Sequence, residues 1–322
     1  MLTKVKYILP FILLTYSVGL KGQHTINNFL KPSESFSKKK YLMATGFSAI
    51  SYSAFSVGLY KAWYNKNQLS RFHTFNDWRE WKSMDKFGHT YSAYLQTALV
   101  FQGAQWIGMN RTNSQWYAVG LSCLFQSTIE IFDGFNEGWG FSWSDIGANI
   151  VGSSIFITQD VLWKEQKFIL KFSSHKIKYD QTNLDLNKRI HNLYSENILQ
   201  RLLKDYNGQS YWLSFNPVSS FTEMKTFWPS YLNLAVGYGA NGLFGGKSNT
   251  WFDSDSRHIQ LSSVDYPRYN QYFLSFDINL QKLPVKSPLL KSIFSVINIF
   301  KIPAPALEIN SLHQVKFHYL LF

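Results

Sequence analysis

The chain contains a single cysteine, Cys123, among its 322 residues. One thiol cannot form an intrachain disulfide, and it also excludes a metal site built on several thiolates. No HExxH motif or paired-cysteine pattern is present, so no signature motif specifies a metal. Cys123 lies within an uncharged stretch that we expect to be helical, and we predict that it is a small core residue.

Charged residues are also scarce. They make up 16% of the chain, whereas about 25% is usual in soluble domains, and aromatic residues reach 18%. This composition favours contact with a membrane or with an extended interface. The mean hydropathy of −0.17 argues against a protein made mostly of lipid-spanning helices. We therefore expect only part of the chain to lie in lipid.

Residues 1–23 have the features of an export signal, because Lys4 and Lys6 precede an apolar stretch from Ile8 to Leu20. An uncleaved membrane helix is the alternative, but Pro10 and the short apolar length favour cleavage. We expect an exported protein of the cell envelope, periplasmic or associated with the outer membrane. Its net charge of +12 then predicts membrane lipids or lipopolysaccharide as partners, and no nucleic acid.

Four uncharged segments predict helices of core or membrane length. They run from Met43 to Tyr60, from Thr90 to Asn110, from Thr112 to Ile129 and from Ile146 to Gln159. Short connections between them imply antiparallel neighbours. We expect a mainly α fold, in which residues 24–40 are a linker and residues 41–170 form a four-helix membrane-associated bundle.

The pattern changes after the bundle. Residues 171–208 predict a polar and amphipathic helical connector, and residues 209–322 predict an α+β region with a small antiparallel sheet. Period-two alternation places strands at Ser210–Phe215, Tyr231–Gly239, Tyr272–Leu280 and Val315–Phe322. The apolar stretch from Leu289 to Phe300 is consistent with either an interfacial helix or a core helix.

Three polar clusters lie at the helix ends and predict a single site. We expect the second helix to begin at Asp85-Lys86-Phe87-Gly88-His89, the third to end near Glu130, and the fourth to begin at Asp145. Antiparallel topology brings these three ends together. The candidate ligand-binding residues are Asp85, Lys86, His89, Glu130, Asp133, Glu137, Asp145 and Asn149.

Asp85 and His89 lie four residues apart and share a helix face, where the carboxylate can orient the imidazole or both can hold one cation. The alternatives are a capping role for Asp85, a structural role for His89 and a turn role for Asp133. A carboxylate at Asp145 in apolar surroundings needs a partner, and we expect Lys86 or His89 to supply it.

Carboxylates together with one histidine suit a divalent cation such as Mg²⁺, Mn²⁺ or Zn²⁺. The candidate metal ligands are His89, Glu130, Asp133 and Asp145. His89 and Glu130 are the candidate catalytic residues, with His89 as acid or base.

The sequence W-K-S-M-D-K-F-G-H from Trp81, followed by E-I-F-D-G-F-N-E-G-W-G-F-S-W-S-D-I-G-A-N-I-V-G from Glu130, resembles the YfiM-like predicted periplasmic lipoproteins, a family of unknown function. The C-terminal extension resembles that of the long Bacteroidetes members. The order D-K-x-x-H, Glu and D-x-x-x-N-x-x-G is distantly similar to VanZ-like membrane proteins. The chain departs from the lipoprotein pattern, because no cysteine stands near the export signal.

Three functions remain open from the sequence. The first is an uncharacterised envelope protein whose polar cluster binds a ligand or stabilises the end of the bundle. The second is a metal-dependent hydrolase or transferase acting on envelope lipids or cell-wall precursors. The third is an outer-membrane assembly partner, suggested by the C-terminal strands and by Phe322, which follows an aromatic alternation like that of the last strand of outer-membrane proteins.

Overall fold

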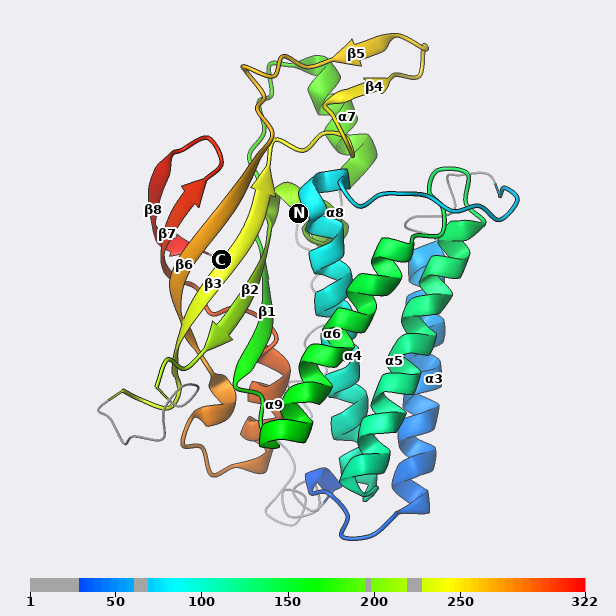
Figure 1. Cartoon of the computed structure of the whole chain (residues 1–322), viewed down its shortest axis with the longest axis vertical. Coiled ribbons are helices and arrows are strands. Elements are labelled where there is room, and N and C mark those ends of the chain that lie inside the picture. The colour runs from blue at the N-terminus through cyan, green and yellow to red at the C-terminus, as the bar shows by residue number, and fades with distance from the viewer. Residues whose placement is uncertain (1–28, 61–68, 195–197, 219–227, 322) are drawn as a thin grey trace, which may run out of the picture.

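The computed structural model describes residues 29–60, 69–194, 198–218 and 228–321. In Figure 1 a helical bundle lies beside a curved antiparallel sheet, with α9 at one end of the sheet and the β4–β5 hairpin at the other. The expected export signal and Phe322 lie outside the described residues. The fold is α+β rather than mainly α, because the sheet is larger than the small one expected.

The bundle contains the four predicted helices: α3 (Lys38–Leu59), α4 (Met84–Ile107), α5 (Arg111–Gly134) and α6 (Trp143–Trp163). Each begins before its uncharged segment, and α3 and α4 end slightly before theirs do. Ser37, Asn110 and Ser142 cap α3, α5 and α6 by accepting backbone N–H groups. None of the helices in the described ranges has both the length and the apolar character needed to cross a bilayer.

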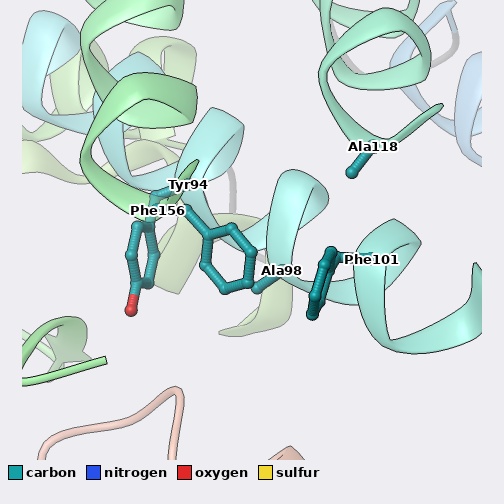
Figure 2. Packing of buried hydrophobic residues seen from close by; sticks show 5 residues of the cluster. All are labelled: Tyr94, Ala98, Phe101, Ala118 and Phe156. Carbon is teal, nitrogen blue, oxygen red and sulfur yellow. The ribbon is translucent and has the colours of Figure 1, made fainter. Parts of the chain in front are cut away.

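Helices α4 and α6 approach each other closely at Gly152. A Cβ atom there would lie 2.0 Å from the carbonyl oxygen of Thr90, so only glycine fits. Farther along these helices, an aromatic cluster fills the bundle core, and Figure 2 shows its members: Tyr94, Ala98, Phe101, Ala118 and Phe156.

Cys123 is exposed, so the prediction of a core position is wrong. The buried residues of α5 recur every four positions and include Ser122, Gln126 and Glu130. Cys123 follows this buried row by one residue, which turns it away from the neighbouring helices. The row is polar, although it faces the interior of the bundle.

Six antiparallel strands form the main sheet in the order β1-β2-β3-β6-β7-β8. They are β1 (Phe168–Ser174), β2 (Gln209–Phe215), β3 (Leu232–Asn241), β6 (Tyr269–Ile278), β7 (Ala304–Asn310) and β8 (Val315–Leu321). A separate hairpin pairs β4 (Thr250–Phe252) with β5 (His258–Gln260). The four predicted strands are confirmed as β2, β3, β6 and β8, and β1, β4, β5 and β7 are additional.

The predicted helical connector is only partly helical. Helices α7 (Leu184–Tyr194) and α8 (Ile198–Lys204) occupy its second half, but its start belongs to strand β1. Helix α9 (Pro288–Ile297) confirms a helix within the apolar stretch between the last strands. Short 3₁₀ turns occur at Glu80–Ser83, Tyr206–Gly208 and Leu280–Lys282.

The inner face of the sheet is partly polar. Lys171 on β1 is fully buried, and its Nζ atom lies 2.7 Å from Asp277 Oδ2 on β6. The same carboxylate oxygen accepts a hydrogen bond from Ser214 Oγ at 2.6 Å. Beside them, Trp212, Ala235, Phe273, Ala306 and Leu321 form a compact apolar cluster.

The start of α4 contacts the sheet through aromatic rings. Phe87 stacks on Tyr238 with ring centroids 4.4 Å apart. Just before α4, Trp81, Lys82 and Ser83 have φ values of 49°, 52° and 63°, which non-glycine residues rarely adopt. Tyr238 Oη donates to Lys82 O at 2.5 Å, so the sheet helps to hold this strained turn in place.

Candidate functional site

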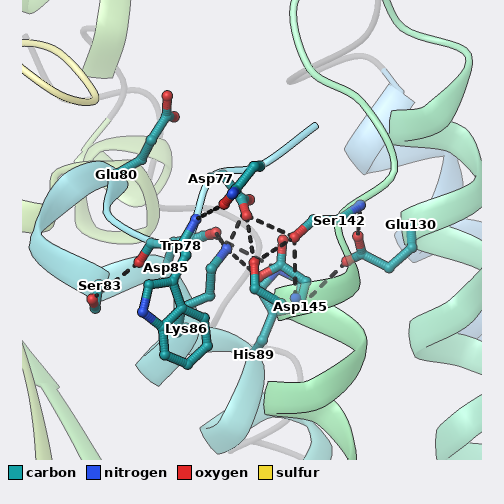
Figure 3. A network of polar contacts seen from close by, with 12 residues as sticks. Asp77, Trp78, Glu80, Ser83, Asp85, Lys86, His89, Glu130, Ser142 and Asp145 are labelled. Atoms are coloured by element: carbon teal, nitrogen blue, oxygen red, sulfur yellow. Dashed lines mark hydrogen bonds and ion pairs between the residues drawn. The ribbon is translucent and has the colours of Figure 1, made fainter. Parts of the chain in front are cut away.

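The ends of α4, α5 and α6 meet as the topology predicts, and Figure 3 shows the polar network between them. Lys86 lies at its centre. Its Nζ atom is 2.7 Å from Asp77 Oδ2, 2.9 Å from Asp85 Oδ2 and 2.5 Å from Asp145 Oδ1. The expected pairing of Lys86 with Asp145 is confirmed. These carboxylates raise the pKa of Lys86 against the opposing effect of burial, which keeps the ammonium charged.

Asp77 is a charged residue of the site that sequence reasoning missed. Its Oδ1 atom accepts hydrogen bonds from Ser142 Oγ at 2.7 Å and from Ser144 Oγ at 2.6 Å. Burial opposes ionisation, but the hydrogen bonds from Lys86 and the two serines lower the pKa of Asp77 to about 2. Asp77 precedes the Asp85 cluster in an irregular segment, where no helical spacing links it to the other residues.

His89 lies between three carboxylates. Its Nε2 atom is 3.8 Å from Asp85 Oδ1 and 3.8 Å from Asp145 Oδ1, and its Nδ1 atom is 3.6 Å from Glu130 Oε1. Nδ1 is also 3.2 Å from Asn149 Oδ1. Burial opposes the charged imidazole, but the surrounding carboxylates raise the pKa of His89. If Nδ1 donates to Asn149, Nε2 remains to hold a proton or a cation.

Glu130 is only 1% exposed, and its Oε1 atom has no hydrogen-bond donor among the described residues. Its other oxygen accepts a long hydrogen bond of 3.4 Å from the backbone of Ser142. Burial raises the pKa of Glu130 to about 8, so its carboxyl group is largely protonated at neutral pH. Burial also raises the pKa of Asp145, with the nearby charge of Asp85 adding to the effect.

A cavity of about 580 Å³ opens beside this network, between the bundle and the sheet. Asp85, His89 and Asp145 line its polar end. The rest of its wall is mainly aromatic and aliphatic, and includes Phe55, Leu95, Phe172, Leu203, Tyr211, Ile299 and Phe300. The cavity is therefore polar at one end and apolar over most of its remaining surface.

Two glutamines on this wall carry buried atoms that make no hydrogen bond to the described residues, Gln96 Oε1 and Gln126 Nε2. Unpaired buried polar atoms are costly, and a bound molecule can satisfy them. The α8–β2 connection also contributes Tyr206, whose hydroxyl donates to Asp85 Oδ1 at 3.2 Å. Sequence reasoning missed these three residues, because glutamine and tyrosine side chains are uncharged and these positions fit no catalytic or metal-binding motif.

The remaining candidates are less closely gathered. Asp133 lines the cavity, as do Trp139 and Gly140. Glu137 is exposed in the turn after α5 and is not among the residues of the cavity wall. Its position close to Glu130 in the sequence does not bring it to the site, because the turn carries it outward.

Asp85, His89 and Asp145 each offer one ligand atom, and these three atoms lie within 4.8 Å of one another. Within the described part of the chain, no other group of histidine, cysteine, aspartate or glutamate residues has this metal-ligand geometry. Two of the expected metal ligands, His89 and Asp145, belong to it. Asp85 completes the group, whereas Glu130 and Asp133 stay as predictions.

Residues 74–159 match a family model described as predicted periplasmic lipoprotein (DUF2279). The matched segment extends from Thr74 to Gln159, near the end of α6, and contains Asp77 and every charged residue of the network. No curated protein and no solved structure matches the chain. The match supports the likeness to predicted periplasmic lipoproteins and leaves the VanZ-like likeness as a resemblance in motifs alone. The chain is thus an exported protein of the cell envelope, and its central segment is similar to a family of predicted periplasmic lipoproteins.

Proposed function

We propose that the cavity binds an amphiphilic molecule of the cell envelope, with the polar head at the Asp85 end and the apolar body between the bundle and the sheet. The supporting observation is the division of one cavity into a charged end and a largely aromatic and aliphatic remainder. Ligand pockets commonly combine an apolar wall with a few polar groups that fix orientation. Gln96 Oε1 and Gln126 Nε2 offer further hydrogen bonds to the ligand.

The charges of the polar end limit the chemistry of the head group. Four carboxyl groups surround two cationic side chains: Asp77, Asp85, Glu130 and Asp145 around Lys86 and His89. With Glu130 protonated, three carboxyl groups remain around the ammonium of Lys86 and the imidazole of His89, and burial raises the pKa of one of them, Asp145, to about 7. This balance favours a head that carries an ammonium group or hydroxyl donors over a bare phosphate monoester.

Native mass spectrometry of the detergent-purified protein, incubated with phosphatidylethanolamine or with phosphatidylglycerol, tests this proposal. Leu95→Trp fills the cavity, whereas Leu99→Trp adds the same ring at an exposed position one turn along α4. We expect the lipid adduct to be lost only in the first variant, and the amine-bearing lipid to bind more tightly. Equal adducts in both variants, or none in the wild type, would refute the proposal.

A second candidate function is metal-dependent hydrolysis or group transfer on such an amphiphile. The arrangement of Asp85, His89 and Asp145 favours it, because three ligands on a divalent ion at about 2.1 Å lie roughly 3–3.6 Å apart. The observed separations of 3.8 Å from His89 Nε2 require only a small closure. A bound ion would lower the pKa of a water ligand and supply a nucleophile. Lys86 opposes this candidate, since its ammonium already forms ion pairs with both carboxylates.

Metal quantification after dialysis against Zn²⁺ or Mn²⁺ tests this second candidate. We expect one equivalent of metal in the wild type and in Glu137→Gln, whose side chain is exposed and away from the cavity wall. Asp85→Asn and His89→Gln should each lose the metal while keeping the thermal unfolding transition. A wild type that retains no metal would exclude metal-dependent chemistry at these residues.

A further inference from the structure

The outer face of the sheet is apolar across four neighbouring strands. Paired residues form a first row of Tyr238, Tyr272, Ile309 and Val315, a second of Val236, Leu274, Leu307 and Phe317, and a third that begins with Leu234 and Phe276. Tyr238 packs on Phe87 of α4, and both Tyr238 and Leu234 are half-buried. The other eight side chains are exposed, from 39% for Leu307 to 66% for Val315. Tyr319, farther along β8, is 86% exposed.

The inner face of the same strands is partly polar, beside the apolar cluster that contains Phe273, Ala306 and Leu321. Between the outward residues, β6 turns Ser275 and Asp277 inward, and β7 turns Glu308 and Asn310 inward, all four of them buried. A sheet that faces water on one side places its polar residues outside and its apolar residues inside. The reversed arrangement here indicates that the outer face does not contact water in the working protein.

Helix α9 extends this apolar surface at the end of the sheet where β6 finishes and β7 begins (Figure 1). Its exposed residues are Leu289, Leu290, Ile293, Val296 and Ile297, while Ser292 and Ser295 are turned inward. The segment 278–307 contains four lysines and no acidic residue. An amphipathic helix with apolar exposure and nearby lysines is typical of binding to an anionic membrane surface.

We propose that the outer face of β3, β6, β7 and β8, together with the exposed side of α9, contacts the acyl chains of a bilayer that contains anionic lipid. Lys286 and Lys291 supply the attraction to the head groups, and both are exposed. Lys282, also exposed, forms an ion pair with Glu165. A protein partner would meet about one hydrogen bond per 100–200 Å², but the second and third rows offer no side-chain polar atom. Acyl chains need no hydrogen-bond partners.

Helix α5 shows the same reversal on the bundle. Its buried row is polar, whereas Trp116, Leu124 and Phe132 on its outer side are 74%, 59% and 51% exposed. Two separate elements thus expose apolar side chains while they bury polar ones. This agreement supports lipid as the occupant, because the reversal is not confined to one edge of one strand.

Flotation with vesicles of phosphatidylcholine, alone or with 30% phosphatidylglycerol, tests the proposal on the full chain exchanged out of detergent. We expect flotation with the anionic vesicles, and at least a tenfold lower partition for the Val315→Ser, Phe317→Ser, Tyr319→Ser triple variant. The matched control is Phe252→Ser with Val264→Ser, which are 70% and 86% exposed at the far end of the molecule. We expect the control to float like the wild type.

Direct contact is measured with bimane on a single cysteine in a Cys123→Ser background. Bimane at position 317 should be quenched at least twofold by brominated phosphatidylcholine, while bimane at position 264 should not, and this readout does not require the triple variant to fold. Equal quenching at the two positions would overturn the proposal. So would a wild type that floats with neither vesicle, or a dimer that buries β8 and excludes lipid.

Discussion

The protonated state of Glu130 makes a measurable prediction about stability. Burial raises its pKa from 4.5 to about 8, so the native state holds a proton that the unfolded chain releases between these pH values. The native state therefore binds more protons than the unfolded state, and the free energy of unfolding falls as pH rises through this window. Replacing Glu130 with glutamine removes the titrating group and keeps its shape.

The magnitude follows from the two pKa values. A single acid with these values costs roughly 0.8 kcal/mol of stability at pH 5 and roughly 4.3 kcal/mol at pH 8. The pKa of about 8 already includes the attraction between ionised Glu130 and the imidazole of His89, 3.6 Å away. We therefore expect the stability advantage of Glu130→Gln to grow by about 3.5 kcal/mol between pH 5 and pH 8.

Denaturant unfolding at pH 5 and at pH 8, followed by tryptophan fluorescence in one nonionic detergent, measures this difference. Glu137→Gln is the control, since its exposed side chain should change stability equally little at both pH values. The reasoning fails if the difference between Glu130→Gln and the wild type does not depend on pH. It also fails if the variant is the less stable protein at pH 8.

Two further predictions concern packing and buried charge. Gly152→Ala should lower the free energy of unfolding by on the order of 2 kcal/mol, because its Cβ would collide with Thr90 O. Gly147→Ala is the control, because it has open space on the same helix. It should be neutral or stabilising by up to about 1 kcal/mol. Equal effects would contradict the close contact. Asp277→Ala should cost about 3–5 kcal/mol because it leaves the ammonium of Lys171 buried without its partner, and a Lys171→Met, Asp277→Leu double variant should cost less. Denaturant midpoints measure both, and a double variant no better than Asp277→Ala would contradict the second.

The bundle could be predicted from sequence because its helices are long and uncharged and have polar caps. The same reasoning brought Asp85, Glu130 and Asp145 together, since antiparallel connections leave few other arrangements. Strand β1 was missed because its inward residues include Lys171 and Ser173. Polar residues of this kind are expected in a connector between domains and not on the buried face of a strand. A sheet with a polar interior hides its strands from rules that expect apolar residues inside.

The cavity could not be predicted at all. Its wall combines residues of α4 and α5 with Leu203, Tyr206 and Tyr211, which lie far away in the sequence and carry no chemical signal of their own. Their place at the site depends on how the sheet lies against the bundle. Glu137 shows the opposite error, because a residue near a cluster in sequence was expected to belong to it in space.

The strained turn before α4 bears on how the protein can be dissected. Trp81, Lys82 and Ser83 each adopt a conformation that costs of order 1–3 kcal/mol unless surrounding structure imposes it. The anchors that impose it are distant in sequence: the backbone N–H of Trp81 donates to Gly246 O at 2.8 Å, and Tyr238 holds Lys82. A fragment limited to residues 74–159 would lack both anchors, so its Asp85 and His89 would lose their register with α6. Residues 74–159 are thus not an autonomous module, and any engineering that exchanges the sheet must also rebuild these two anchors.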